Sequence, residues 1–189
     1  MYTTIYMVRH AESPYTEGNE RTRGLTADGW QKAQAVTEAL RNEGIQAFVS
    51  SPYARAVLTI EGLAKQLQLP IETIEDLRER QFAGEDYIIS DEQFIPAIEK
   101  MFSDPDYALP GGETSSDCQN RAIAALKTIL TAYKGMKVAI GTHGNVMTLM
   151  MQYFDPAYNL AFFNQTRKPD IYKLQFEQLE LKQVTRIEI

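Results

Sequence analysis

The feature that most constrains the fold of this chain is an alternation of short apolar runs with longer amphipathic segments. The apolar runs over residues 3–8, 47–50, 71–74 and 136–140 have the length and composition of strands. Segments such as 26–43 and 115–133 carry apolar residues at helical spacing. This alternation is typical of a layered α/β domain with parallel strands. We therefore predict a single domain over residues 1–189, a three-layer α/β/α sandwich with a mainly parallel central sheet.

Local signals refine this prediction. Thr26 stands where a helix N-cap is expected, and Ser51 followed by Pro52 predicts the start of another helix. Two last strands, over residues 172–176 and 181–189, are predicted to pair around Gln178. Residues 85–112 break the alternation, because a short helical stretch there is followed by turn-forming prolines and glycines. We expect this segment to be a small insertion that caps the active site.

Composition narrows the class of protein. Hydrophobic residues make up 44% of the chain, enough for a core without metal or disulfide, and the one cysteine, Cys118, leaves no internal disulfide possible. We therefore expect a cytoplasmic protein. The net charge of −6 argues against nucleic acid and against an anionic membrane as partners. Two histidines without a Cys/His cluster argue against a metal site, and no cofactor is expected.

Both histidines follow an apolar run, at the point where a strand would end. Arg9 precedes His10, so a guanidinium that can grip phosphate oxygens stands beside an imidazole that can attack phosphorus. His143 is followed by Gly144 at a predicted helix start, whose free N–H groups can hold an anion. Arg55 lies in the first turn of another predicted helix. Ligands of open α/β sheets bind beyond the carboxyl ends of the strands, so we expect these residues to share one site.

Glu79 lies between Arg78 and Arg80, after a predicted strand. A glutamate between two arginines is commonly part of a surface ion pair. It could instead donate a proton to a leaving group. The residues alone leave both interpretations open.

Taken together, these segments resemble the histidine phosphatase superfamily, which includes the cofactor-dependent phosphoglycerate mutases. The resemblance rests on the order and spacing of short motifs over roughly residues 3–150. The matching segments are Arg9-His10-Ala11-Glu12, Gly24-Leu25-Thr26-Ala27-Asp28-Gly29, Ser50-Ser51-Pro52-Tyr53-Ala54-Arg55-Ala56, Leu77 to Gly84, Gly112-Glu113-Thr114 and Thr142-His143-Gly144-Asn145.

The resemblance implies a role for each candidate residue. His10 becomes the phosphorylated nucleophile, and Glu79 the proton donor to the leaving oxygen and then the base for water. His143 and the basic side chains surround the transferring phosphate, which needs fixed positive charge rather than a metal. The implied catalytic residues are His10, Glu79 and His143, and the substrate-binding candidates are Arg9, Arg55, Gly144, Arg21 and Arg23.

Two departures from the family pattern bear on the activity. The stretch over residues 14–23 is shorter than in mutases, which must exclude water from their phosphorylated intermediate, and this favours hydrolysis over isomerisation. Ala11 replaces a glycine, which is the only sequence support for a weakly active member. We predict a phosphomonoesterase of the histidine acid phosphatase type, a hydrolase that acts on small phosphate esters through a phosphohistidine at His10. The alternatives are a cofactor-dependent phosphoglycerate mutase and a weakly active protein that binds phosphorylated ligands. The expected partner is a small phosphorylated substrate, and the expected assembly is a monomer or homodimer.

Overall fold

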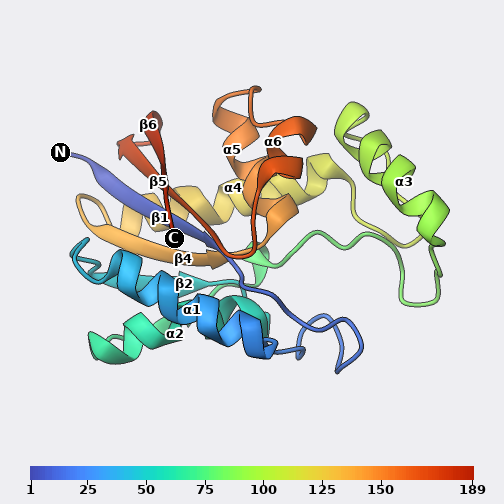
Figure 1. Ribbon diagram of the computed structural model, residues 1–189. Coiled ribbons are helices and arrows are strands. Elements are labelled where there is room, and N and C mark those ends of the chain that lie inside the picture. The colour runs from blue at the N-terminus through green and yellow to red at the C-terminus, as the bar shows by residue number, and fades with distance from the viewer.

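A computed structural model describes residues 1–189, with the side chain of Asp91 left out of the description. Its strands form one six-stranded sheet in the order β3-β2-β4-β1-β5-β6, with helices on both faces (Figure 1). The elements in chain order are β1 (Thr3–Arg9), α1 (Ala27–Leu40), β2 (Ala47–Ser50), α2 (Ala54–Gln66), β3 (Ile71–Thr73), the short 3-10 helix η1 (Glu75–Leu77), α3 (Asp91–Ser103), α4 (Ser115–Ala132), β4 (Lys137–Thr142), α5 (Gly144–Phe154), α6 (Leu160–Gln165), β5 (Asp170–Glu177) and β6 (Glu180–Ile187).

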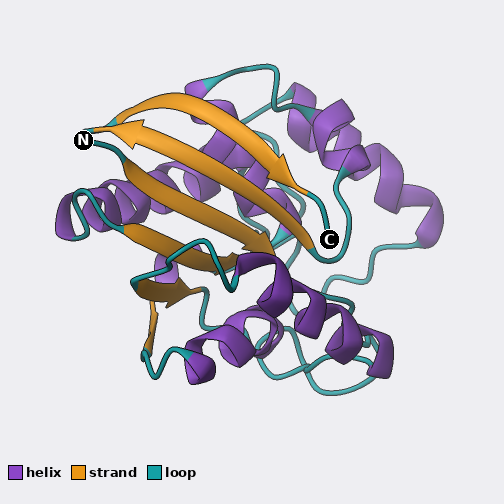
Figure 2. Cartoon of the chain, turned by 60° about the vertical axis from the view of Figure 1, so that its left-hand side comes forward, coloured by secondary structure: helices purple, strands orange, loops and turns teal.

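The sheet is mainly parallel, as predicted. Strands β3, β2, β4 and β1 pair in parallel, and β5 and β6 add antiparallel to the β1 edge. The last two strands are joined at Gln178, which adopts a left-handed backbone with φ of 55°. Figure 2 shows this hairpin continuing the sheet beyond β1. The predicted α/β/α sandwich is therefore confirmed.

Two apolar cores hold the layers together, one on each face of the sheet. Strand β1 contributes to both, because its side chains alternate between the faces. Ile5 and Met7 pack against α4 and α5, whereas Tyr6 and Val8 pack against α1 and α2. All four side chains are fully buried, so β1 is a central strand of the domain.

The register of the parallel strands brings their carboxyl ends to one edge. Arg9 at the end of β1 pairs with Thr142 at the end of β4, and Ser50 at the end of β2 pairs with Gly141. The residues that follow each strand therefore emerge side by side. This edge is where ligands bind in open α/β sheets.

The predicted start of the second helix was wrong. Thr26 caps α1 as expected, since its hydroxyl accepts the Gly29 N–H at 3.0 Å, but α2 begins at Ala54 rather than beside Pro52. The reason is that Ser51 still extends β2: its N–H donates to the Gly141 carbonyl at 2.9 Å. Its hydroxyl lies 2.7 Å from Nε2 of His143, the residue that follows β4.

Helix α3 lies outside the three layers, to one side of the sheet's carboxyl edge (Figure 1). It belongs to a small apolar cluster of its own, built around Ala97, Met101 and Leu109. No helix in the described part of the chain is long and apolar enough to cross a membrane.

Candidate active site

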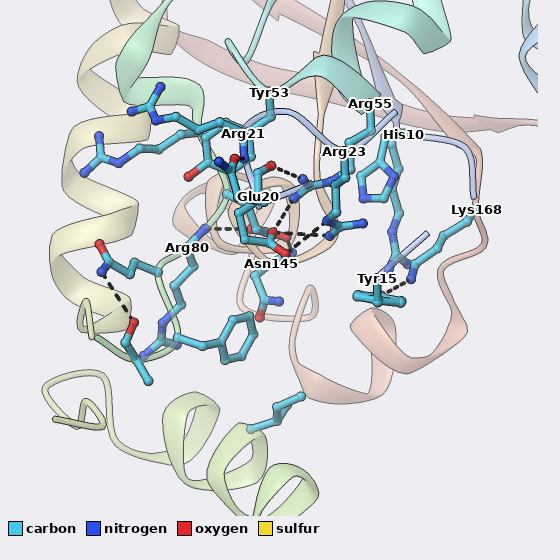
Figure 3. A pocket seen from close by; sticks show the side chains of 18 of the residues that line it. His10, Tyr15, Glu20, Arg21, Arg23, Tyr53, Arg55, Arg80, Asn145 and Lys168 are labelled. Carbon is cyan, nitrogen blue, oxygen red and sulfur yellow. Dashed lines mark hydrogen bonds and ion pairs between the residues drawn. The ribbon is translucent and has the colours of Figure 1, made fainter. Parts of the chain in front are cut away.

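A pocket of about 1060 Å³ opens at the carboxyl edge of the parallel strands. Figure 3 shows basic side chains from several elements converging on it. Six of the eight predicted site residues line it, namely Arg9, His10, Arg21, Arg23, Arg55 and Glu79. The other two, His143 and Gly144, are buried at the adjoining start of α5. The structure therefore brings all eight to one place.

His10 directly follows β1 and is 5% exposed. Its Nδ1 lies 2.6 Å from the Ala11 carbonyl oxygen, which can only accept, so we assign the proton to Nδ1 and the lone pair to Nε2. Burial, followed by the charge of Arg55 and then that of Arg9, holds the pKa of His10 well below its usual value. The imidazole is thus kept neutral, with a free nitrogen that can act as a nucleophile.

Ala11 fits this site although a glycine is expected there. Its backbone is not in the left-handed region, and its N–H donates to the Thr59 hydroxyl at 2.9 Å. The Thr59 hydroxyl in turn donates to the Arg55 carbonyl at 2.7 Å. The segment after β1 is therefore tied to the first turns of α2.

His143 is fully buried, and its ring centroid lies 5.2 Å from that of His10. Its Nε2 is 2.7 Å from the Ser51 hydroxyl oxygen, which also accepts the Tyr53 N–H at 3.3 Å. We assign the hydroxyl proton to the bond with Nε2, which leaves the proton of a neutral His143 on Nδ1. Burial and then the neighbouring His10 and Arg55 hold the pKa of His143 well below its usual value.

Arg9 crosses the start of α5. Its guanidinium donates to the Thr166 carbonyl at 3.1 Å and to the Thr166 hydroxyl. A Cβ at Gly144 would stand 2.8–3.0 Å from three atoms of this guanidinium, so only glycine leaves room for it. The choice of Gly144 is therefore explained by the passage of Arg9.

Arg23 and Arg55 line another part of the pocket wall, and both are buried. Each donates to the carboxylate of Glu20, a residue of the loop between β1 and α1 (Figure 3). Tyr53 lies under the Arg55 guanidinium at 5.0 Å from its ring centroid and also contacts His143 edge to face. Burial alone would raise the pKa of Glu20, but the two arginines outweigh it and lower that pKa below its usual value.

The basic groups around His10 retain unused donors. In the described part of the chain, four buried nitrogens of the site have no hydrogen-bond partner: Arg9 Nε, Arg23 Nη1, Arg55 Nε and His143 Nδ1. Buried polar groups are nearly always paired, and leaving one unpaired costs about 1–3 kcal/mol. A cluster of four such donors is the arrangement expected of an anion-binding site.

Glu79 lies at the N-terminus of α5. One carboxylate oxygen accepts the N–H groups of Val146 and Arg80, both at 2.9 Å, and the other accepts the Asn145 N–H at 3.1 Å. The Asn145 and Val146 N–H groups are first-turn donors that a helix cannot satisfy by itself, and they complement a carboxylate well. The side chain lines the pocket, so it is more than a member of a surface ion pair.

Arg21 lies at the rim of the pocket. Its guanidinium pairs with Glu75 and is 54% exposed, while it also lies 5.5 Å from the Tyr53 ring centroid. Unlike Arg23, it therefore holds no buried, unpaired donor. Of the two arginines predicted in this stretch, Arg23 is the one placed in the wall beside Arg55.

Several residues of the site were not predicted from the sequence. Ser51 stood in a matched motif but was interpreted as a helix cap, and Glu20 carried no sequence signal as a partner of arginines. The far end of the pocket is apolar: Phe94, from the segment expected to cap the site, lines it together with Phe82 and Ile98, which the sequence did not single out. At the rim, Lys168 donates to the Tyr15 hydroxyl at 2.9 Å, and Arg23 lies over the same ring. The Lys168–Tyr15 pair forms only through the fold, because its members are 153 residues apart in sequence.

Comparison with known proteins identifies the family. The family model described as "Histidine phosphatase superfamily (branch 1)" matches residues 5–183, nearly the whole chain. The chain belongs to the histidine phosphatase superfamily. The predicted family is thereby confirmed.

The relatives of this superfamily member include phosphatases and mutase-like proteins. It is 29% identical over 147 residues to the uncharacterized phosphatase PhoE of Bacillus subtilis (strain 168), covering 75% of this chain and 72% of that protein. It is 30% identical over 167 residues to phosphoglycerate mutase-like protein 4 of Arabidopsis thaliana, covering 82% and 73%. Among solved structures, Bacillus stearothermophilus YhfR matches with a TM-score of 0.79 at 25% identity, covering 95% of this chain and 94% of that one. A mycobacterial glucosyl-3-phosphoglycerate phosphatase shares the fold, with a TM-score of 0.78 at 19% identity and coverage of 98% and 97%.

Proposed function

We propose that this member of the histidine phosphatase superfamily hydrolyses small phosphate monoesters through a covalent phosphohistidine at His10. The observation that carries this proposal is the cluster of four buried, unpaired nitrogens beside a neutral His10 with a free Nε2. A transferring phosphoryl group spreads negative charge over three oxygens, and fixed donors stabilise it. Its relationship to PhoE supports the same class of reaction.

In the first step, the lone pair of His10 Nε2 attacks phosphorus and the bond between phosphorus and the ester oxygen breaks. The electron pair of that bond goes to the leaving oxygen, which takes a proton from the Glu79 carboxyl group. Arg9, Arg55 and His143 Nδ1–H hold the equatorial oxygens, and the Gly144 N–H adds a helix-terminal donor. His10 then carries the phosphoryl group.

In the second step, water attacks the phosphohistidine and restores the free imidazole. Glu79 accepts the proton that water loses, and inorganic phosphate leaves. The hydrogen bonds from the first turn of α5 to the Glu79 carboxylate support this role, because they hold the carboxylate in the pocket lining. Glu79→Gln is expected to slow esters with poor leaving groups most, since those depend most on the proton donor.

We further propose the acid phosphatase subtype, supported by the low pKa of His10. A histidine with an unshifted pKa of about 6.5 would take up a proton and lose its lone pair in mild acid. Burial and Arg55 hold the pKa of His10 well below that value. Turnover is therefore expected to persist below about pH 6.5 and to fall only as pH drops through the lowered pKa. A pH–rate profile with its acid limb at the ordinary histidine value would contradict this.

Mutase activity is the second candidate, because mutase-like proteins are among the relatives. It would require that the phosphorylated His10 be protected from water while the substrate reorients. Isomerisation of phosphoglycerate, primed with the bisphosphate, tests it directly. Faster isomerisation than phosphate release would favour the mutase. A weakly active phospho-ligand binding protein would show neither activity.

Four further features complete the proposal: a cap, the partner, the assembly state and the location. Residues 85–112, which include α3, would cap the apolar end of the pocket, because Phe94 and Ile98 line it. The partner would be a small phosphorylated molecule rather than nucleic acid or membrane, and the chain would act as a monomer or homodimer. A cytoplasmic location is supported by the single cysteine, Cys118, which is free and buried. Cell fractionation and light scattering test the last two points.

The test of the proposed function is phosphate release from p-nitrophenyl phosphate and a panel of metabolite phosphates, in the presence of a chelator. Wild type is expected to turn over, and His10→Ala to lose activity. Arg41→Met, at an exposed ion pair on α1 remote from the pocket, is the control for handling and folding. Equal activity in His10→Ala and wild type would overturn the proposal.

A further inference from the structure

Glu20 places one carboxylate between two buried arginines of the site. Arg23 donates from Nε to one oxygen at 3.0 Å and from Nη2 to the other at 3.2 Å. Arg55 donates from Nη2 to the carboxylate at 3.0 Å and from Nη1 to the Glu20 carbonyl at 2.5 Å. Figure 3 shows the dashed interactions that join Glu20 to both guanidinium groups.

These contacts use only part of each guanidinium. Glu20 accepts hydrogen bonds from Nε and Nη2 of Arg23 and from both Nη atoms of Arg55. In the described chain, Arg23 Nη1 and Arg55 Nε remain buried without a partner. The planar guanidinium has donors in fixed directions, so gripping one side determines where the remaining N–H points. An anion can thus bind these two nitrogens without displacing Glu20.

The burial of the three residues fits this arrangement. The Arg55 and Arg23 side chains are 1% and 6% exposed, whereas that of Glu20 is 61% exposed. The carboxylate therefore supports the arginines from the solvent side of the site. Glu20 is held close to the arginines by the hydrogen bond from Arg55 to its backbone carbonyl, in addition to the ion pairs of its carboxylate.

The loop that carries Glu20 is itself fixed. The side-chain oxygen of Asn19 accepts the N–H groups of Arg21 at 2.9 Å and Thr22 at 3.1 Å, closing an Asx-type turn. The Asn19 carbonyl accepts the Arg23 N–H at 2.9 Å. The Ala54 N–H donates to the Arg21 carbonyl at 2.9 Å, which joins this turn to the start of α2, next to Arg55.

We propose that Glu20 is a positioning residue that aligns Arg23 and Arg55 for the phosphate of the substrate. The inference rests on the proposed function, in which the unpaired nitrogens of Arg55 and Arg23 are among the donors for the phosphoryl group. The rival interpretation is that the Glu20 carboxylate competes with phosphate for the same arginines. The two differ in sign, because a competitor or a simple like charge weakens phosphate binding, whereas a positioning residue strengthens it.

The test measures the affinity for inorganic phosphate by calorimetric titration in wild type, Glu20→Gln and Glu20→Asp. Glu17→Gln is the matched control, because it removes the same charge from an exposed position in the same loop. We expect Glu20→Gln to weaken phosphate binding about tenfold, from the loss of charge-assisted hydrogen bonds that orient both arginines. Glu20→Asp, which keeps the carboxylate, is expected to recover part of that loss, and Glu17→Gln to bind like wild type or slightly tighter.

Turnover of p-nitrophenyl phosphate gives the second readout. Because the transferring group is the one that the arginines hold, Glu20→Gln is expected to lower kcat/KM in parallel with phosphate affinity, measured at a temperature where thermal unfolding shows that both proteins remain folded. Glu20→Gln that binds phosphate as tightly as wild type, or tighter, would overturn the inference. Wild type that fails to bind phosphate would overturn it as well.

The titration separates this inference from the proposed function, since it needs no turnover. Weaker phosphate binding in Glu20→Gln supports the positioning role even if His10→Ala retains activity, an outcome that would overturn only the phosphohistidine mechanism. Conversely, loss of activity in His10→Ala together with unchanged phosphate affinity in Glu20→Gln would overturn only the positioning role.

Discussion

Gly144 lies against the guanidinium of Arg9, and this contact makes it a sensitive position for activity. The Cβ of Gly144→Ala would stand 2.8–3.0 Å from the Arg9 guanidinium, which is the flexible end of a side chain and can move aside. We expect the fold to persist while kcat/KM falls about tenfold or more, because a displaced guanidinium no longer meets the phosphate. Steady-state kinetics and thermal unfolding measure the two effects.

The matched control for this substitution is Gly24→Ala. A Cβ at Gly24 would meet only Leu58 Cδ1, at an ordinary 3.6 Å. It should leave kcat/KM unchanged. Wild-type kinetics in Gly144→Ala would show that Arg9 does not need its observed position.

Ser51 holds the imidazole of His143 through its hydroxyl. Ser51→Ala removes the 2.7 Å hydrogen bond to Nε2 and with it the preference for a proton on Nδ1. We expect about a tenfold loss of kcat/KM for p-nitrophenyl phosphate, with a destabilisation of about 1 kcal/mol, typical of one lost hydrogen bond. Ser50→Ala, whose hydroxyl makes only a 3.4 Å contact with the Gly141 carbonyl, is the neighbouring control. Equal kinetics in the two variants would contradict the role of Ser51.

At the scale of elements, α4 anchors the segment that carries Glu79. Arg121 on α4 donates to the carbonyls of Asp76 at 2.6 Å and Arg78 at 3.0 Å, and it pairs with both oxygens of Glu113 at 2.6 and 2.7 Å. The matched Gly-Glu-Thr motif thus serves packing: Glu113 pairs with Arg121, and the next residue caps α4. Arg121 does not itself line the pocket, but it holds the backbone of Arg78 and Glu79, which do.

Arg121→Met is therefore expected to destabilise the fold by about 3 kcal/mol, since it removes the closest partner of the nearly buried Glu113 and leaves only a 3.7 Å pairing with Arg78. Activity should fall as well, because the Glu79 segment loses its anchor. Urea unfolding measures the first effect and kcat the second. The control is Arg41→Met, which removes an exposed pair with Glu38 and should change stability by about 0.5 kcal/mol or less. Equal stability of the two variants would contradict the anchoring role.

Sequence patterns predicted the elements well where local rules and tertiary structure agree. The Thr26 cap and the hairpin at Gln178 were predicted because their signals lie within a few residues of the feature. The start of α2 was misplaced because Ser51 satisfies its hydroxyl across the sheet, with His143, rather than along its own helix. The pairing of Glu20 with Arg55 spans 35 residues and follows only from where the loop is folded.

At the scale of the whole molecule, the two buried histidines couple folding to pH. Burial holds the pKa of both His10 and His143 well below the usual value. The unfolded chain therefore binds protons at these two histidines more readily than the native state does. The stability that this provides is complete above about pH 6.5 and is lost as pH falls from there toward the lowered values.

We therefore expect the free energy of unfolding of wild type to decrease between about pH 7.5 and about pH 5. The double variant His10→Gln/His143→Gln, which cannot titrate at these positions, should decrease less over the same range. Urea unfolding at both pH values measures the difference. An identical pH dependence in the two proteins would contradict neutral, buried histidines.

The central claim, a phosphoryl group carried on His10 Nε2, is tested most directly by trapping the intermediate. A rapid quench of wild type with radiolabelled p-nitrophenyl phosphate, followed by peptide mapping, locates the label. The mechanism predicts an acid-labile, alkali-stable phosphoramidate on the peptide that contains His10, and none in His10→Ala. Turnover by wild type with the label on another residue, or with label persisting in His10→Ala, would contradict the mechanism.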